Sequence, residues 1–73
     1  MDRQYIGERL ISLRKAKGMT QEEVAKAIGI SASAYSQYET GAKIPRDDTK
    51  VAISKFFNRS VQFIFFNYNT HLK

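Results

Sequence analysis

An all-α fold, a compact five-helix bundle, is predicted by the spacing of apolar residues and by the residues that start and stop helices. In the first segment, Ile6, Leu10 and Leu13 lie at positions i, i+4 and i+7, on one face of a helix. Glycines then divide the chain into short helical segments. Before the C-terminal segment, no stretch has the strict alternation of a strand. We therefore expect residues 1–73 to form one helical domain.

The composition limits the classes of protein that fit. A domain of 73 residues buries only about 60% of the surface that its unfolded chain exposes. The chain has no cysteine and no cluster of metal-ligand residue types, so we expect no disulfide, no metal and no cofactor. Twelve Lys and Arg against seven Asp and Glu give a net charge of +5. Such a charge suits a polyanionic partner, nucleic acid or an anionic membrane.

No segment has the pattern of a targeting or membrane-spanning sequence. The start of the chain is charged and lacks the apolar stretch of a signal peptide. The longest apolar run, residues 63–66, is far too short to span a bilayer. We therefore expect a cytoplasmic protein without a membrane partner.

The first two helices have specific stop and start signals. Gly18 is a natural end for the first helix. Thr20 is predicted as the N-cap of the second helix, with Glu23 at N3 completing a capping box. Gly29 ends this helix after barely two turns.

A tight turn joins the second helix to a third, and the pair is predicted as a helix-turn-helix over residues 21–40. Ser31 is the N-cap of the third helix, which covers residues 32–40 and ends at Gly41. Gly29 can take a positive φ, which turns the chain steeply between the helices. The outward face of the third helix has short, neutral side chains that reach into a groove about 12 Å wide: Ala32, Ser33, Ser36, Gln37 and Thr40.

Two further helices follow a basic, turn-forming loop at residues 41–45. Asp47 or Asp48 is predicted as the N-cap of the fourth helix, and Ser60 as the cap of a short fifth helix. The tail, residues 69–73, is polar and is expected to fray. The apolar face of the fourth helix is formed by Ala52, Ile53, Phe56 and Phe57.

All five phenylalanines fall between residues 56 and 66, more than one small bundle is expected to bury. An exposed apolar patch usually marks a partner surface. The sequence therefore predicts a dimerisation segment at residues 60–68. An alternative is that this patch binds a different protein, as in an antitoxin-like module that also binds DNA. The predicted homodimer interface consists of Phe63, Ile64, Phe65 and Phe66.

The family resemblance rests on six short motifs spread along the chain. They are, in order, Leu13-Arg14, Gly18-Met19-Thr20-Gln21, Val24-Ala25, Ile28-Gly29-Ile30-Ser31, Tyr38-Glu39-Thr40-Gly41 and Pro45. With these motifs the sequence resembles the phage-repressor (Cro-type, XRE) helix-turn-helix family over nearly its whole length. The resemblance implies a lambda-repressor-like bundle of five helices, whose third helix lies in the major groove of DNA.

The resemblance also implies which residues of the third helix read the bases. Ala32, Ser33 and Gln37 occupy base-facing positions, and Ser36 and Thr40 flank them. A glutamine can pair with both N6 and N7 of adenine, so Gln37 is the leading candidate. The alternative is a solvated glutamine on an exposed helix face.

Other roles follow from the resemblance residue by residue. Gln21 matches a residue that hydrogen-bonds a phosphate, and Lys43 and Arg46 match a basic loop that grips the DNA backbone. Solvated side chains are the alternative for both basic residues. Arg14 and Glu39 match an ion pair that ties the first helix to the third, a structural role.

The sequence departs from the family at three positions. Tyr35 stands where a branched aliphatic residue is usual, and its hydroxyl needs a partner, for which we predict a DNA phosphate. Ala32 offers no hydrogen bond, only contact with a thymine methyl. Arg59 replaces an apolar residue before the fifth helix.

These features predict a sequence-specific, double-stranded DNA-binding transcriptional regulator, a repressor that reads a palindromic operator as a homodimer. The expected protein is bacterial or phage-encoded and associated with the nucleoid. No enzymatic role is expected, because no nucleophile with a base and an orienting group is present. The single histidine, His71, lies in the tail. No small-molecule ligand is predicted.

Overall fold

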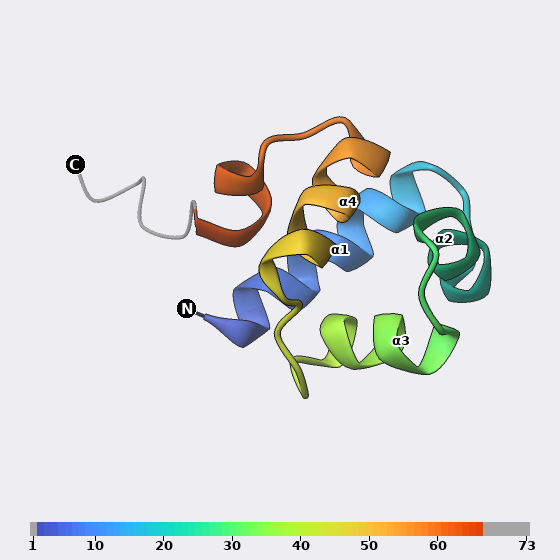
Figure 1. Cartoon of the computed structure of the whole chain (residues 1–73), viewed down its shortest axis with the longest axis horizontal. Coiled ribbons are helices and arrows are strands. Elements are labelled where there is room, and N and C mark those ends of the chain that lie inside the picture. Colours follow the sequence, from blue (N-terminus) through green and yellow to red (C-terminus); the bar gives the residue numbers. More distant parts are fainter. Residues whose placement is uncertain (1, 67–73) are drawn as a thin grey trace.

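The computed structural model describes residues 2–66, which form five helices and no strand (Figure 1). The predicted all-α fold with five helices is confirmed. Residues 67 and 68 of the predicted dimerisation segment, the tail and His71 lie outside the described residues. None of the helices within residues 2–66 is long and apolar enough to cross a membrane. The helices are α1 (Arg3–Ala16), α2 (Gln21–Ile28), α3 (Ala32–Thr40), α4 (Asp47–Phe57) and η1 (Gln62–Phe66).

Local capping sets the bounds of α2 and α3 where they were predicted. Thr20 Oγ1 accepts from the backbone N–H of Glu23 at 3.1 Å, and the Glu23 carboxylate accepts from the N–H of Thr20 at 2.8 Å. Ser31 Oγ accepts from the N–H of Ala34 at 3.0 Å and so caps α3. Gly29 ends α2 at φ 92°, a conformation in which a Cβ would be strained.

The start of α4 differs from the prediction. Arg46 is the N-cap and makes no capping hydrogen bond through its side chain. Asp47 and Asp48 both lie in the first turn instead, and the Asp48 carboxylate accepts from the N–H of Thr49 at 2.8 Å. Because carboxylates are favourable anywhere in the first turn of a helix, this pair stabilises α4 without occupying the cap.

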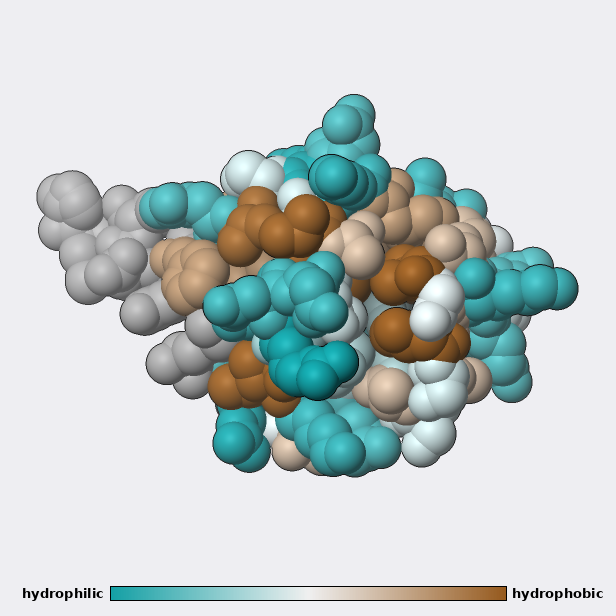
Figure 2. Space-filling view, in the orientation of Figure 1, coloured by the Kyte–Doolittle hydropathy of each residue, from teal (hydrophilic) through white to brown (hydrophobic). Residues whose placement is uncertain are grey.

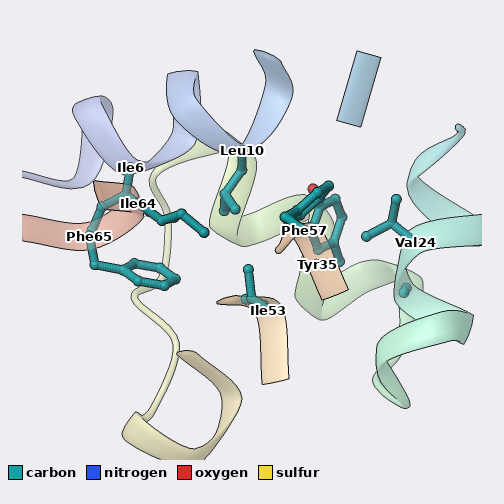
Figure 3. Packing of buried hydrophobic residues seen from close by; sticks show 9 residues of the cluster. Ile6, Leu10, Val24, Tyr35, Ile53, Phe57, Ile64 and Phe65 are labelled. Atoms are coloured by element: carbon teal, nitrogen blue, oxygen red, sulfur yellow. The ribbon is translucent and has the colours of Figure 1, made fainter. Parts of the chain in front are cut away.

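The hydrophobic core lies where the helices meet (Figure 3). Helix α1 packs against α3 and η1, and α2 packs against α3 and α4. Every helix contributes at least one fully buried side chain, so α3 is anchored to a core that the whole chain builds. The largest of these side chains are Tyr35, Phe65, Ile6, Leu10, Ile53, Ile64 and Val24.

The C-terminal segment corrects the predicted dimer interface. Ile64 and Phe65 are both 0% exposed and belong to the core, so their predicted place at an interface is wrong. The segment winds as a π-helix, which Ser60 caps by accepting from the N–H of Phe63 at 3.0 Å. Of the four residues predicted for the interface, only Phe66, which is 40% exposed, and the half-buried Phe63 have surface that a partner could contact.

Two arginines hold the Phe63 ring of η1, one from α1 and one from the connection between α4 and η1. The guanidinium carbons of Arg9 and Arg59 lie 4.0 and 3.8 Å from the centre of the Phe63 ring. Both guanidinium groups are thus within cation–π distance of the same ring. Arg9 also donates to the Tyr5 hydroxyl, which in turn donates to the carbonyl of Phe63, both at 2.9 Å. Arg59 thus serves in packing through a cation–π contact, although it replaces an apolar residue.

Candidate nucleic-acid interface

Helix α3 lies along one edge of the molecule, with its inner side on the core (Figure 1). Two residues fix that inner side: Tyr35, which is 0% exposed, and the buried Glu39. The chain turns between α2 and α3 at Gly29, and the two helices pack against each other, with Val24 and Ala25 the buried residues of α2. The opposite side of α3 therefore faces outward on a rigidly held helix.

The outward side presents a single stripe of short polar residues. Ser33, Ser36, Gln37 and Thr40 lie at i, i+3, i+4 and i+7 and so share one face. Ser33 and Thr40 are exposed, and Ser36 and Gln37 are half-buried. Ala32 lies beside this stripe and packs partly against the core. The structure thus brings the predicted base-contacting residues to the surface of one helix.

Within residues 2–66, the hydrogen bonds of this stripe are all local. The Gln37 amide donates to the carbonyl and the hydroxyl of Ser33 at 3.3 and 3.4 Å. Thr40 Oγ1 donates to the carbonyl of Gln37 at 3.2 Å and accepts from the N–H of Ala42 at 3.3 Å. Hydrogen bonds as long as those of Gln37 are weak. The Gln37 amide can therefore exchange Ser33 for a base edge at little cost.

A buried ion pair holds the end of α3 against α1. Arg14 donates to both carboxylate oxygens of Glu39, at 2.7 and 3.2 Å, and to the carbonyl of Met19 at 3.0 Å. Burial raises the pKa of Glu39, but the hydrogen bonds from Arg14 and Gln21 outweigh burial and hold this pKa below its ordinary value. Arg14 and Glu39 thus form the pair that the resemblance implied, and it locks helix geometry.

Gln21, for which the resemblance implied a phosphate contact, is tied to the same carboxylate. Its amide nitrogen donates to Glu39 Oε1 at 2.8 Å. A primary amide has two N–H donors, so the second remains for another acceptor. Gln21 lies at the first position of α2, where the positive end of the helix dipole favours an anion.

Tyr35 corrects the sequence prediction. Its ring lies in the core (Figure 3), and with no exposed surface it cannot contact a phosphate. The hydroxyl is also buried and has no hydrogen-bond partner of acceptable geometry among residues 2–66. Burial, and then the nearby Glu39 carboxylate, raise the pKa of Tyr35 above its ordinary value.

Replacing Tyr35 with phenylalanine should therefore leave the free energy of unfolding unchanged or raise it by about 1 kcal/mol, because a buried hydroxyl without a partner is costly. The affinity for DNA should not change. Urea denaturation and a DNA titration of the Tyr35→Phe variant check both statements. A stability loss above about 1 kcal/mol would mean that the hydroxyl has a hydrogen-bond partner in the fold. A several-fold loss of affinity would mean that Tyr35 does contact DNA.

The loop after α3 carries two exposed cations, Lys43 and Arg46. The backbone N–H of Lys43 donates to the carbonyl of Gln37 at 3.2 Å, and the buried Pro45 anchors the loop. Arg46 has an 87% exposed side chain and only a distant ion pair, at 4.0 Å, with Asp48. Lys43 can therefore meet an anionic partner near the end of α3. Arg46 can do so near the turn between α2 and α3, where it lines a hollow with residues 28–30.

Sequence reasoning missed one residue that lies behind this interface and packs against α3, Gly7 of α1. It is buried, and the backbone of Glu39 occupies the space where its Cβ would lie. A glycine inside a helical pattern usually has a packing reason. The signal was therefore present, because Gly7 shares the face of α1 that carries Arg14.

Comparison with proteins of known sequence agrees with this geometry. The sequence model of the helix-turn-helix family matches residues 10–64. The HTH-type transcriptional regulator YobD of Bacillus subtilis (strain 168) is 40% identical over 57 residues, which are 78% of this chain and 51% of that protein. The cryptic phage CTXphi transcriptional repressor RstR of Vibrio cholerae is 39% identical over 56 residues, 77% of this chain and 50% of that protein. The chain thus spans about half the length of these relatives.

Solved structures show the same arrangement of helices. The DNA-binding domain of the P22 C2 repressor superposes with a TM-score of 0.78 at 31% identity, covering 88% of this chain and 84% of that one. The clp gene regulator ClgR from C. glutamicum superposes with a TM-score of 0.77 at 25% identity, covering 97% and 92%. The fold, the motifs and these matches confirm the predicted resemblance: the chain belongs to the phage-repressor (XRE-type) helix-turn-helix family.

Proposed function

We propose that this chain is the DNA-binding domain of a transcriptional repressor that reads double-stranded DNA with α3 in the major groove. The observation that carries the proposal is the polar stripe of α3, held outward by a buried tyrosine and a buried ion pair on the other side of the helix. Similarity to a phage repressor and to a repressor domain supports it. The proposal includes no catalytic role.

In this proposal, base contacts and backbone contacts come from different residues. Gln37 pairs with an adenine, Ser33, Ser36 and Thr40 add hydrogen bonds, and Ala32 touches a thymine methyl. Contacts to phosphates fix the register of the protein and supply most of the salt-dependent affinity. The backbone contacts are made by Gln21, Lys43 and Arg46.

Replacing Gln37 with alanine should cost about 1–3 kcal/mol at one base pair and relax the preference there. The polar stripe otherwise stays intact, because Gln37 makes only weak bonds to Ser33. Competition titrations with single-base variants of the preferred duplex measure this effect. Lys43→Ala is the matched control, since loss of a phosphate contact weakens all sequences alike. If the Gln37→Ala variant keeps the wild-type base preference at every position of the duplex, Gln37 does not read a base.

The proposal extends to a homodimer on a palindromic site. Two copies would present their α3 helices about 34 Å apart, one turn of B-DNA. The burial of Ile64 and Phe65 reduces the surface first predicted for pairing. Among residues 2–66, the exposed large hydrophobic residues are Val51 and Phe66, and Figure 2 shows apolar and hydrophilic residues interspersed on the face where α4 lies. Sedimentation velocity with and without the duplex tests this part. The antitoxin-like alternative depends on the same aromatic patch, so the burial of Ile64 and Phe65 reduces the surface for it in the same way.

The experiment that tests the proposal is selection of bound duplexes from a randomised pool at about 150 mM salt, because non-specific binding weakens steeply with salt. An enriched palindrome with half-sites about ten base pairs apart would support a dimeric, sequence-specific repressor. Enrichment of a single half-site would support sequence reading without the dimer. Retention without enrichment would reduce the function to general DNA binding, and no retention would overturn it.

A further inference from the structure

Helix α1 meets the last turn of α3 backbone to backbone at Gly7. A Cβ at this position would overlap the carbonyl oxygen of Glu39, and it would lie 3.0 Å from the carbonyl carbon of Glu39 and 3.3 Å from the carbonyl oxygen of Tyr38. All three atoms belong to the backbone of α3, which cannot move aside as the end of a flexible side chain can. The missing Cβ therefore sets how closely the two helices approach.

Other contacts hold the same end of α3 in place. Arg14 and Gln21 bind the Glu39 side chain, and Gly41, which follows α3, lies near the backbone of Arg3. Arg3, Gly7 and Arg14 share one face of α1. The C-terminal end of α3 is thus located by α1, whereas its N-terminal end is located by the turn from α2 at Gly29.

A methyl group at position 7 would therefore displace the C-terminal end of α3 more than its N-terminal end. To reach an ordinary contact distance, the last turn of α3 would have to retreat from α1 by roughly 1 Å. Thr40 lies on the turn that moves, and Gln37 lies one turn before it, whereas Ser33 lies near the end fixed by α2. A recognition site tolerates displacements of only about 0.5 Å.

We infer that Gly7 is a positioning residue for base recognition: its lack of a side chain sets the depth at which Gln37 and Thr40 meet the base pairs. Gly7 itself does not reach DNA, since it is buried between α1 and α3. This inference rests on the proposed reading of DNA by α3. It adds a residue of α1 to the determinants of specificity.

The test compares the Gly7→Ala variant of the full chain with the wild type and with Ile64→Ala. Ile64→Ala is a stability control, because Ile64 is a buried residue of η1, outside the helix-turn-helix. Affinities are measured for the duplex that the wild type selects and for each of its single-base variants, and circular dichroism gives the folded fraction. Base pairs read by Gln37 are identified beforehand with Gln37→Ala.

After correction for the folded fraction, Gly7→Ala should bind the selected duplex about tenfold or more weakly, as expected for a site displaced beyond its tolerance. Its preference should flatten at the base pairs assigned to Gln37 and persist at those read near Ser33. Ile64→Ala should keep the wild-type preference at every position. A folded Gly7→Ala chain with the wild-type profile, or with a loss that is equal at all positions, would overturn the inference.

Two further outcomes remain distinct. If Gly7→Ala is partly unfolded, trimethylamine oxide is added, since this osmolyte favours compact states. A chain that stays unfolded even with osmolyte and excess duplex would assign Gly7 to folding alone and overturn the positioning role. If the wild type itself selects no sequence, the proposed function fails first, whatever Gly7→Ala does.

Discussion

Replacing Arg14 with methionine should lower the free energy of unfolding by about 3–5 kcal/mol, enough to unfold much of so small a domain. The Glu39 side chain is only 2% exposed, and it would keep its charge but lose both hydrogen bonds from the guanidinium. Methionine restores most of the volume of the arginine stem, so the loss measures an unpaired buried carboxylate and not a cavity.

Urea denaturation followed by circular dichroism measures this loss. The Arg14→Met, Glu39→Met double variant should recover most of the stability, because an apolar pair of similar volume can replace a buried ion pair. Arg46→Met is the exposed control, and it should change the stability by less than about 0.5 kcal/mol. A loss below about 1 kcal/mol in Arg14→Met would mean that the pair contributes no more than a surface salt bridge.

The same pair predicts how acid affects the fold. The folded-state pKa of Glu39 lies below its ordinary value of 4.5, so its contribution is fully present above pH 4.5 and is lost as the pH falls through the lower folded pKa. Glu39→Gln should be less stable than the wild type at neutral pH, and the difference should shrink as the pH falls below 4.5. A difference that is constant from neutral to acid pH would contradict the lowered pKa.

Replacing Phe65 with alanine should cost about 3–5 kcal/mol, whereas Phe66→Ala should cost about 1 kcal/mol or less. The two residues are adjacent and identical in chemistry, but Phe65 is 0% exposed and Phe66 is 40% exposed. A large cavity opens only where the ring is enclosed. The contrast separates a core role for this segment from the dimer interface that its sequence suggests.

Thermal denaturation at two protein concentrations completes this comparison. Loss of a core residue lowers the midpoint equally at both concentrations. If Phe65 lay at a dimer interface, the wild-type midpoint would instead rise with protein concentration, and Phe65→Ala would lose that rise. Equal losses for Phe65→Ala and Phe66→Ala, or a concentration dependence that the wild type shows and Phe65→Ala lacks, would place Phe65 at an interface.

The bounds of α2 and α3 could be predicted because their determinants are local. Thr20 and Glu23 satisfy each other's backbone donors within one turn, and Ser31 does the same for α3. A glycine with positive φ ends each helix, at Gly29 and Gly41. The outward stripe of α3 follows from these bounds and from helical periodicity, so the position of the candidate interface could also be predicted.

The errors arose where distant parts of the chain decide the outcome. Phe65 and its neighbour Ile64 both point inward because η1 winds as a π-helix across α1, and no local signal indicates that winding. The hydroxyl of Tyr35 suggests a phosphate contact, because a hydroxyl needs a hydrogen-bond partner. Burial of the ring in the core outweighs that need, and the hydroxyl is buried with it. The need for a glycine at position 7 arises only from the backbone of Tyr38 and Glu39 in α3, more than thirty residues further along the chain.

The central claim, that α3 is the surface which meets DNA, is tested most directly by a heteronuclear NMR titration of the isotope-labelled chain with its selected duplex. The largest changes in amide chemical shift should fall on residues 32–40, on Gln21 and on the loop at residues 43–46. The side of α1 that carries Tyr5 and Arg9, opposite the face turned to α3, should remain nearly unchanged. Changes concentrated on that side or on η1, with α3 unaffected, would contradict the account.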